Sequence, residues 1–257
     1  MKINFISYEN TVHKFKEKLL VETAQIHNIN ISFIGRNSKI GESVPWKGFM
    51  DKLTTTKKYL ESIDSELVCV LDSRDILFAA NESKILDTFL NVFSKDTVIF
   101  NGETNCYPDS SLAELHPMQD KKYKYLNAGA CMGNRELLLT IYEDAIKLYK
   151  ENGHDDDQLQ LQTLLVNNRF DNQFTLDYDC NIFQCIWDED WGRNNNFDLV
   201  YTKDCIYNRL TKTVPLIFHY PGPTCVGSQA YKVITKNYYS LIDNTYINKK
   251  VYGEKYD

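Results

Sequence analysis

The sequence predicts one α/β domain whose central sheet is mainly parallel and is flanked by helices. Its 257 residues are enough to bury a large core, and 43% of them are hydrophobic against 25% charged, as in ordinary globular proteins. Short apolar runs alternate with longer segments of helical periodicity, which is the βαβ pattern of parallel sheets. No repeat, low-complexity tract or linker rich in Pro, Gly and Ser divides the chain, so residues 1–257 are predicted to form a single domain.

The first half of the chain carries this alternation most clearly. A run such as "ELVCVL" at 66–71 is short and apolar, as expected of a buried strand. The segment 11–27 instead places Val12, Phe15 and Leu19 at close to helical spacing. On these grounds strands are predicted at 2–7, 29–35, 66–71 and 96–102, and helices at 11–27, 47–63 and 82–93.

The second half is less regular. The segment "YLNAGACMGN" at 125–134 is apolar and rich in small residues, and its pattern assigns it no definite element. Residues 135–152 have the periodicity of an amphipathic helix. Further helices are predicted at 155–168 and 227–242, and strand-like segments at 174–187 and 214–223.

Bulk properties exclude several classes of protein. The net charge is −6 and no basic stripe is present, which argues against a nucleic-acid partner. No apolar run is long enough to span a bilayer, and the first ten residues lack the apolar core of a signal peptide. Seven cysteines without CxxC pairs indicate reduced thiols. A cytoplasmic protein is therefore expected, with the lumen of the endoplasmic reticulum as the alternative if a signal was removed; the oligomeric state is left open.

Two carboxylates, Asp72 and Asp75, follow directly after the predicted strand 66–71. Ligands of open parallel sheets bind at the carboxyl ends of strands, and two carboxylates placed there repel each other unless a cation or Arg74 relieves them. A divalent cation with oxygen ligands is one solution, and a simple turn is the other. An aspartyl nucleophile would require a second carboxylate two residues after the first, where Arg74 stands instead.

A third ligand is expected from far along the chain. His219 ends the apolar run "LIFH" and is followed by Pro221 and Gly222, which force a loop. A lone His is more often a structural hydrogen-bonding residue, but imidazole together with two carboxylates suits Mn²⁺. Gly222 would let the backbone approach a phosphate closely.

The stretch "DDDQ" at 155–158 is the other concentration of charge. One Asp would suffice to cap the helix that follows, whereas three adjacent carboxylates repel one another. Capping and a role in chemistry both remain open from the pattern alone.

These pieces resemble, in order, the N-terminal glycosyltransferase domain of the multifunctional procollagen lysyl hydroxylase/glycosyltransferases. The resemblance extends from about residue 3 to about residue 225, and its motifs are individually weak but jointly specific. They are "WKG" (46–48), "VLDSRDILFA" (70–79), "NGETNCYPD" (101–109), "YLNAGACMG" (125–133), "DDDQL" (155–159), "LDYDCNIFQ" (176–184) and "HYPGPT" (219–224).

The resemblance implies a GT-A fold, Mn²⁺ as cofactor and a UDP-sugar donor. It implies transfer of glucose from UDP-glucose to galactosyl-hydroxylysine of collagen or a collagen-like chain, with retention at the anomeric carbon. A galactosyltransferase acting on hydroxylysine, or a non-catalytic module that binds sugar or collagen, remains an alternative. The chain is too short to include the hydroxylase domain of those enzymes, so no hydroxylation is expected.

The resemblance also implies roles for individual residues. Asp72, Asp75 and His219 match the metal ligands, while Asp156 and Asp157 match the acidic stretch beside the transferring sugar, which is implied to be catalytic. The nucleotide side is implied to comprise Ser7, Trp46, Lys52, Arg74 and Gly222, and the acceptor and sugar side Glu103, Tyr107, Asn127 and Gln158.

Two departures from the family pattern matter. Arg74 stands where the family has an aromatic residue between the two aspartates, so base stacking would become guanidinium stacking or a phosphate contact. Cys225 stands where the family has a Lys near the diphosphate, and Arg74 is a candidate to replace that charge.

Overall fold

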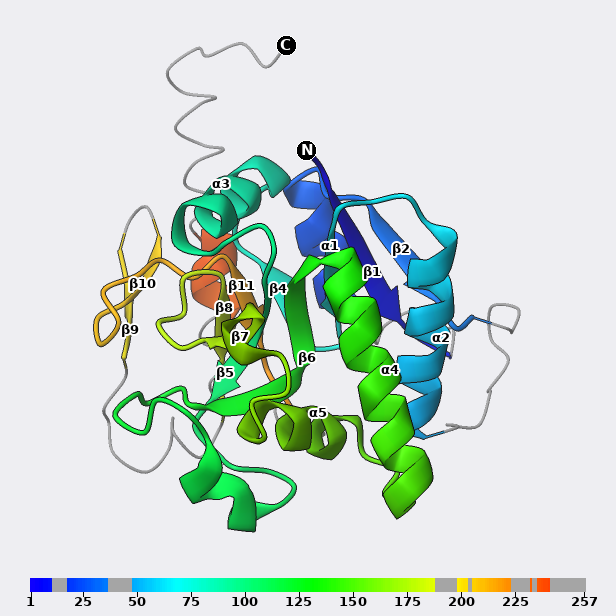
Figure 1. Ribbon diagram of the computed structural model, residues 1–257. Helices are drawn as coiled ribbons and strands as arrows, with labels where there is room; N and C mark the ends of the chain where they lie inside the picture. The colour runs from blue at the N-terminus through cyan, green and yellow to red at the C-terminus, as the bar shows by residue number, and fades with distance from the viewer. Residues whose placement is uncertain are drawn as a thin grey trace, which may run out of the picture.

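A six-stranded sheet forms the centre of the protein in the computed structural model, which describes residues 1–10, 18–36, 48–187, 198–202, 205–222, 232 and 235–240 (Figure 1). The strand order is β2-β1-β3-β6-β5-β7. The strands are β1 (Ile3–Tyr8), β2 (Ile31–Ile34), β3 (Leu67–Leu71), β5 (Val98–Glu103), β6 (Tyr125–Asn134) and β7 (Phe174–Asp177).

The sheet is mainly parallel, as predicted, and β6 is the exception. β1 pairs in parallel with β2 and β3, and β5 pairs in parallel with β7. β6 is antiparallel to both of its neighbours, β3 and β5. It follows β5 through residues 104–124, which contain only the short 3₁₀ helix η1 (Ser110–Leu115), and a connection without a crossover helix returns the chain antiparallel.

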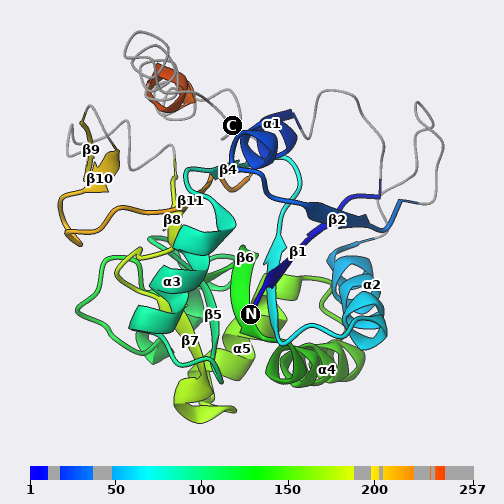
Figure 2. The ribbon, with the colours of Figure 1, turned by 90° about the horizontal axis from the view of Figure 1, so that it is seen from above.

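Helices cover both faces of this sheet, as Figure 2 shows from above. β3 illustrates the reason, because its side chains alternate between two cores: Val68 and Val70 pack on one face, and Leu67, Cys69 and Leu71 on the other. The first face carries α2 (Phe49–Ser62), α4 (Arg135–Asn152) and α5 (Asp157–Val166), and the second carries α1 (Lys18–Ile26) and α3 (Glu82–Val92).

A three-stranded sheet shares the second face with α1 and α3. Its order is β4-β11-β8, where β4 is Ile76–Phe78, β8 is Phe183–Cys185 and β11 is Ile217–His219. β11 is antiparallel to β4 and parallel to β8. A separate hairpin pairs β9 (Leu199–Tyr201) with β10 (Ile206–Asn208).

Most predicted elements are confirmed, with specific differences. The strand-like segment 174–187 is two strands, β7 and β8, which lie in different sheets. β4 was not predicted, because its three residues continue an apolar run interrupted by charges. The helix expected at 11–27 is described only from Lys18, and of the helix expected at 227–242 residues 232 and 235–240 are described and are helical.

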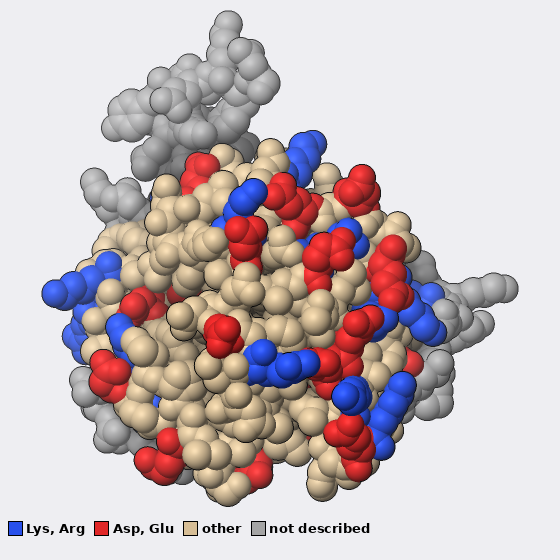
Figure 3. All heavy atoms as spheres, in the orientation of Figure 1, with Lys and Arg blue, Asp and Glu red and all other residues tan. Residues whose placement is uncertain are grey.

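The visible surface has no extended basic region. Figure 3 shows Lys and Arg interspersed with Asp and Glu over the face that carries α3 and α4, in keeping with the net charge of −6. Among the described residues, no helix combines the length and the hydropathy required to cross a bilayer.

The packing of α3 on the sheet gives a test of the core. Phe89 is fully buried and Leu90, its neighbour on the same helix, is 42% exposed. We expect Phe89→Ala to lower the free energy of unfolding by about 3–5 kcal/mol, because it leaves a cavity. Leu90→Ala is the matched control and should cost less than about 1 kcal/mol in a urea titration. Equal costs for the two variants would show that this core is not assembled as described.

Candidate metal centre

The chain passes from one sheet to the other between β3 and β4, and this passage holds Asp72 and Asp75. The backbone N–H of Asp72 donates to the Gly129 carbonyl at 2.7 Å, and the Tyr220 N–H donates to the Asp75 carbonyl at 2.9 Å. His219 lies opposite Ile76 in the antiparallel pair of β4 and β11. This register places the imidazole beside both carboxylates, although the residues are far apart in sequence.

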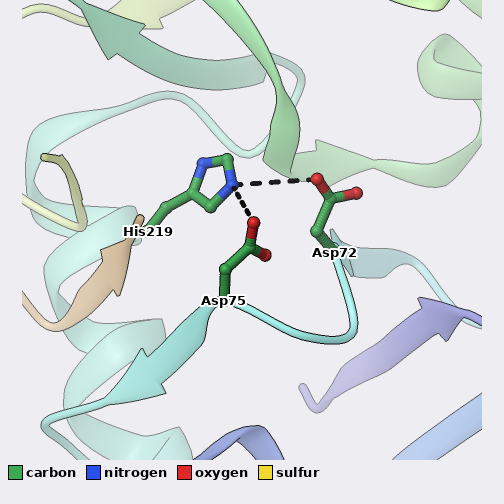
Figure 4. A group of neighbouring side chains, drawn as sticks. All are labelled: Asp72, Asp75 and His219. Carbon is green, nitrogen blue, oxygen red and sulfur yellow. Dashed lines mark ion pairs between the residues drawn. The ribbon is translucent and has the colours of Figure 1, made fainter. Parts of the chain in front are cut away.

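The three side chains converge on one point, as Figure 4 shows. Nε2 of His219 lies 3.7 Å from Oδ2 of Asp72 and 3.6 Å from Oδ2 of Asp75. One ligand atom from each residue lies within 4.8 Å of the others. The structure therefore brings together the three residues that the sequence nominated as metal ligands.

This cluster fits a divalent cation on three further observations. Nε2 of His219 and Oδ1 of Asp75 are buried and have no hydrogen-bond partner among the described residues. The other ring nitrogen, Nδ1, lies 3.3 Å from the Asn101 amide, which orients the ring and leaves Nε2 facing the carboxylates. Imidazole with two carboxylates is also a donor set that suits Mn²⁺.

Without a cation, the neighbouring carboxylates determine the pKa of the His219 imidazole. Burial on its own lowers the pKa of His219, but the negative charges of Asp75 and Asp72 outweigh burial and raise that pKa above its usual value. A bound cation would balance the same negative charge.

Gly129 on β6 is necessary for this close approach. A Cβ atom at this position would lie 2.1 Å from Cε1 of His219 and 2.8 Å from Oδ2 of Asp72. The β5–β6 ladder also shifts register here, because Phe100 pairs with Cys131 whereas Asn101 pairs with Asn127. The bulge leaves the backbone of residues 128 and 129 free to bond the site.

Site side chains use the backbone groups released by this bulge. The Ala128 N–H donates to Oε1 of Gln158 at 2.9 Å, and the Ala128 carbonyl accepts from Nζ of Lys52 at 3.3 Å. The Gly129 N–H donates to Oδ1 of Asn127 at 2.9 Å. Asn127 thus shapes the β6 bulge, and its resemblance-implied role in binding the sugar or acceptor stays a prediction.

Lys52 is a buried cation between two carboxylates. Its Nζ lies 2.7 Å from Oδ1 of Asp72 and 3.1 Å from Oδ2 of Asp157. Burial opposes the charged form, but Asp157 and Asp72 together raise the pKa of Lys52 well above its usual value, so the ammonium remains charged. Asp157 is buried as well, and burial raises its pKa against the lowering effect of Lys52.

Each residue of "DDDQ" makes a different contact. Asp155 accepts from the Met50 N–H in the first turn of α2 at 2.9 Å, and Asp156 is the N-cap of α5 and accepts from the Leu159 N–H at 2.8 Å. Asp157 pairs with Lys52, as described above. Three adjacent carboxylates are therefore accommodated because two serve helix N-termini and the third meets a buried cation.

Gln158 connects this helix to a second buried carboxylate, Glu103 on β5. Nε2 of Gln158 donates to Oε1 of Glu103 at 2.8 Å and to the Tyr107 carbonyl at 2.7 Å, and the indole N–H of Trp187 donates to the other carboxylate oxygen. Burial raises the pKa of Glu103 to about 7, against the lowering effect of these donors. Gln162 donates to the Tyr107 carbonyl as well, at 2.9 Å.

Tyr107 itself is 58% exposed, so its ring is accessible at the rim of the site. Its carbonyl is fixed by two glutamines, whereas its side chain faces solvent. This combination places an aromatic surface at a defined position without burying it.

Arg74 does not project freely toward a ligand. Its Nε and Nη2 atoms each lie 2.8 Å from the carboxylate of Glu9, which also accepts from the Ser73 hydroxyl at 2.8 Å. Glu9 is buried at the end of β1 and offsets the charge of Arg74. A cavity of about 160 Å³ adjoins the metal cluster, and its lining includes Tyr8, Phe49, Lys52 and Arg74.

Of the remaining residues expected on the nucleotide side, Ser7 and Gly222 are described and Trp46 is not. Ser7 is buried in β1 opposite Leu71, and its hydroxyl has no hydrogen-bond partner among the described residues. Gly222 has φ of 88°, and a Cβ at this position would lie 3.8 Å from the Trp187 ring. Trp46 and Cys225 lie outside the described residues.

Sequence reasoning missed four residues of this site: Glu9, Asn101, Gln162 and Trp187. Glu9 and Asn101 each follow an apolar run, as Asp72 does, so a polar residue at a strand end was the available signal. Gln162 and Trp187 carried no such signal, because their partners lie on elements distant in sequence.

Comparisons with known proteins agree on one family. The family described as "PLOD GT domain" matches residues 11–243. The uncharacterized protein R699 of Acanthamoeba polyphaga mimivirus is 32% identical over 217 residues, which are 83% of this chain and 45% of R699. The multifunctional procollagen lysine hydroxylase and glycosyltransferase of Caenorhabditis elegans is 28% identical over 80% of this chain and 29% of that protein. The chain thus spans less than half the length of these relatives.

A solved structure supports the fold. A glycosyltransferase involved in the glycosylation of the major capsid of PBCV-1 matches with a TM-score of 0.53, covering 94% of this chain and 98% of that chain at 12% identity. At this identity the likeness concerns the fold alone, and that fold is GT-A, as the resemblance implied.

The crowding at Gly129 gives a test of the site. We expect Gly129→Ala to weaken Mn²⁺ binding by about tenfold or more, because the added methyl group displaces His219 or Asp72. Gly153→Ala is the control away from the site: nothing lies within 4 Å of its Cβ position, although its φ of 73°, unlike the backbone of Gly129, makes the variant strained. Both affinities can be measured from the electron paramagnetic resonance of free Mn²⁺. Wild-type affinity in Gly129→Ala would contradict the assignment.

Proposed function

Because this chain belongs to the PLOD GT domain family, we propose that it is a Mn²⁺-dependent glycosyltransferase that moves glucose from UDP-glucose to galactosyl-hydroxylysine in collagen or a collagen-like protein. The observation that carries the proposal is the cluster of Asp72, Asp75 and His219 at the carboxyl end of β3, where ligands of such sheets bind. The donor, the acceptor and the retention of anomeric configuration rest on the family alone.

Asp72, Asp75 and His219 would hold the cation, which supplies positive charge to a diphosphate leaving group. Cleavage of a sugar–UDP bond places negative charge on that group, and selective stabilisation of this charge is what accelerates transfer. The protein contributes by fixing the ligands in place before the substrate arrives: the Asn101 amide orients His219, and the Gly129 carbonyl holds the backbone of Asp72.

The cavity beside the cluster would receive the nucleotide. Its lining includes the aromatic residues Tyr8 and Phe49, and the latter is 43% exposed. Ser7 lies at the same strand end, and Trp46 and Gly222 are assigned to the nucleotide through the family. Arg74 would contact the base or a phosphate while Glu9 holds its guanidinium group. Cys225 stands where the family has a Lys. Arg74 would supply hydrogen-bond donors in place of that Lys, but not its net positive charge, because Glu9 neutralises Arg74.

The acceptor side would be formed by Tyr107, Glu103, Asn127 and Gln158. Tyr107 would offer its exposed ring to the acceptor sugar. Glu103 has a pKa of about 7 and two fixed donors, so it would accept a hydrogen bond from a hydroxyl group with its geometry already set. Asp156 or Asp157 would orient the attacking hydroxyl or stabilise positive charge on the donor ring.

A screen of donors and acceptors tests the proposal. The purified chain with Mn²⁺, UDP-glucose and a galactosyl-hydroxylysine collagen peptide should release UDP, whereas EDTA should abolish the release. Asp75→Asn should also abolish UDP release, because it removes the charge of a metal ligand. Its free energy of unfolding should be about unchanged, because the side-chain size is kept. Preference for UDP-galactose with a hydroxylysine peptide would indicate the galactosyltransferase instead. Release with neither pair would indicate a binding module without catalysis.

The acidic stretch gives a second test. Asp156→Asn keeps the cap on α5, because Asn also caps well, so the free energy of unfolding should change by less than about 0.5 kcal/mol. If the charge of Asp156 serves the transition state, turnover should fall by about a hundredfold, in line with about 2.7 kcal/mol. Asp155→Asn is the control, because Asp155 is exposed and also accepts a hydrogen bond from the first turn of a helix, here from the Met50 N–H of α2. Equal turnover in the two variants would show that Asp156 only caps α5 and has no role in catalysis.

A further inference from the structure

We propose that Lys52 is a positioning residue of the metal site, which fixes the Asp72 carboxylate so that its second oxygen faces His219 and Asp75. The inference rests on the metal site of the proposed function. It concerns a residue that contacts a metal ligand rather than the metal. It differs from the role that the resemblance implied, in which Lys52 approaches the nucleotide.

The ammonium group of Lys52 is surrounded by oxygen atoms of the protein. An ammonium group has three N–H donors, and Nζ has three oxygen neighbours, at 2.7 Å (Asp72), 3.1 Å (Asp157) and 3.3 Å (the Ala128 carbonyl). The side chain of Lys52 is only 10% exposed. Two of these contacts are hydrogen bonds, to Asp72 and the Ala128 carbonyl, and the third is the ion pair with Asp157, so Lys52 acts on the metal site through Asp72.

The two oxygens of Asp72 are divided between Lys52 and the cluster. Oδ1 accepts from Lys52, and Oδ2 lies 3.7 Å from Nε2 of His219. The side chain of Asp72 is 34% exposed, so packing alone does not hold its carboxylate in one orientation. Groups that orient a metal ligand from behind typically alter metal affinity when they are removed.

Asp157 holds the ammonium from the other side. It lies at the start of α5, and its Oδ1 atom accepts from the Gln158 N–H at 3.0 Å, so the carboxylate is itself fixed. Removal of Lys52 alone would leave Asp157 as a buried charge without a partner, and the loss of stability would obscure any effect on the metal. The test therefore removes Lys52 and the Asp157 charge together.

The experiment compares Lys52→Met/Asp157→Asn with Asp157→Asn alone. The double variant lacks one positive charge near the cation that the single variant keeps. Electrostatics alone would therefore make the double variant bind Mn²⁺ more tightly. The positioning role has the opposite sign: the double variant should bind Mn²⁺ about ten- to a hundredfold more weakly, because Asp72 is no longer oriented.

The readout is the paramagnetic resonance of free Mn²⁺ titrated into the full chain, with and without UDP. Equal or tighter binding of Mn²⁺ by the double variant overturns the inference. If the double variant does not fold, Lys52→Leu/Asp157→Asn replaces it: its side chain is uncharged and has no donor for Asp72, so the same two outcomes apply. Circular dichroism at each titration temperature establishes that the compared variants are folded.

Wild type and Asp75→Asn distinguish this inference from the proposed function. If the wild type binds no Mn²⁺, or if Asp75→Asn binds it equally well, the metal site is wrong and the role of Lys52 is wrong with it. If the wild type binds Mn²⁺, Asp75→Asn does not and the double variant matches Asp157→Asn, the metal site stands and only the role of Lys52 is overturned.

Discussion

The passage of the chain from β3 to β4 is the constraint on which the site depends. Four residues, 72–75, leave the six-stranded sheet and enter the three-stranded one, and both ends of this passage are tied by backbone hydrogen bonds, to Gly129 and from Tyr220. Pairing of β4 with β11 then determines which residue of β11 faces the passage, and that residue is His219. The second sheet therefore supplies the third ligand of the cluster, and a shift of one residue in its register would turn the imidazole to the opposite face.

Buried charge is the second constraint, and the charged residues are arranged in separate groups around the site. Lys52 balances Asp72 and Asp157, and Glu9 balances Arg74. Burial raises the pKa of Glu103 to about 7, and donors from Trp187 and Gln158 partly offset that rise. Each of these four carboxylates thus has a partner on another element. Preorganisation of this kind suits a site in which charge develops during reaction, because the surrounding groups need not rearrange.

The fold followed from the sequence where periodicity and composition act locally. The short apolar run of β3 predicted a buried strand, and the helical spacing of residues 135–152 predicted α4 with matching bounds. β6 was not predicted, because its Gly and Ala residues have weak strand propensity, and Gly129 is required instead by the close approach of His219 and Asp72. β4 was not predicted because three residues are too few for a period, and only pairing with β11 makes them a strand.

For the site, the sequence by itself determined the chemistry available: two carboxylates after a strand, an imidazole before a Pro-Gly loop and an acidic stretch before a helix. These residue types at strand and helix ends are local facts, and they were sufficient to nominate Asp72, Asp75 and His219. Only the tertiary structure decided what each polar group meets. Lys52 contacts Asp72 and Asp157 rather than open solvent, and Arg74 contacts Glu9, because α2, α5 and β1 converge there on β3 and β6. Such contacts join residues tens to more than a hundred positions apart, and no spacing in a single sequence encodes them.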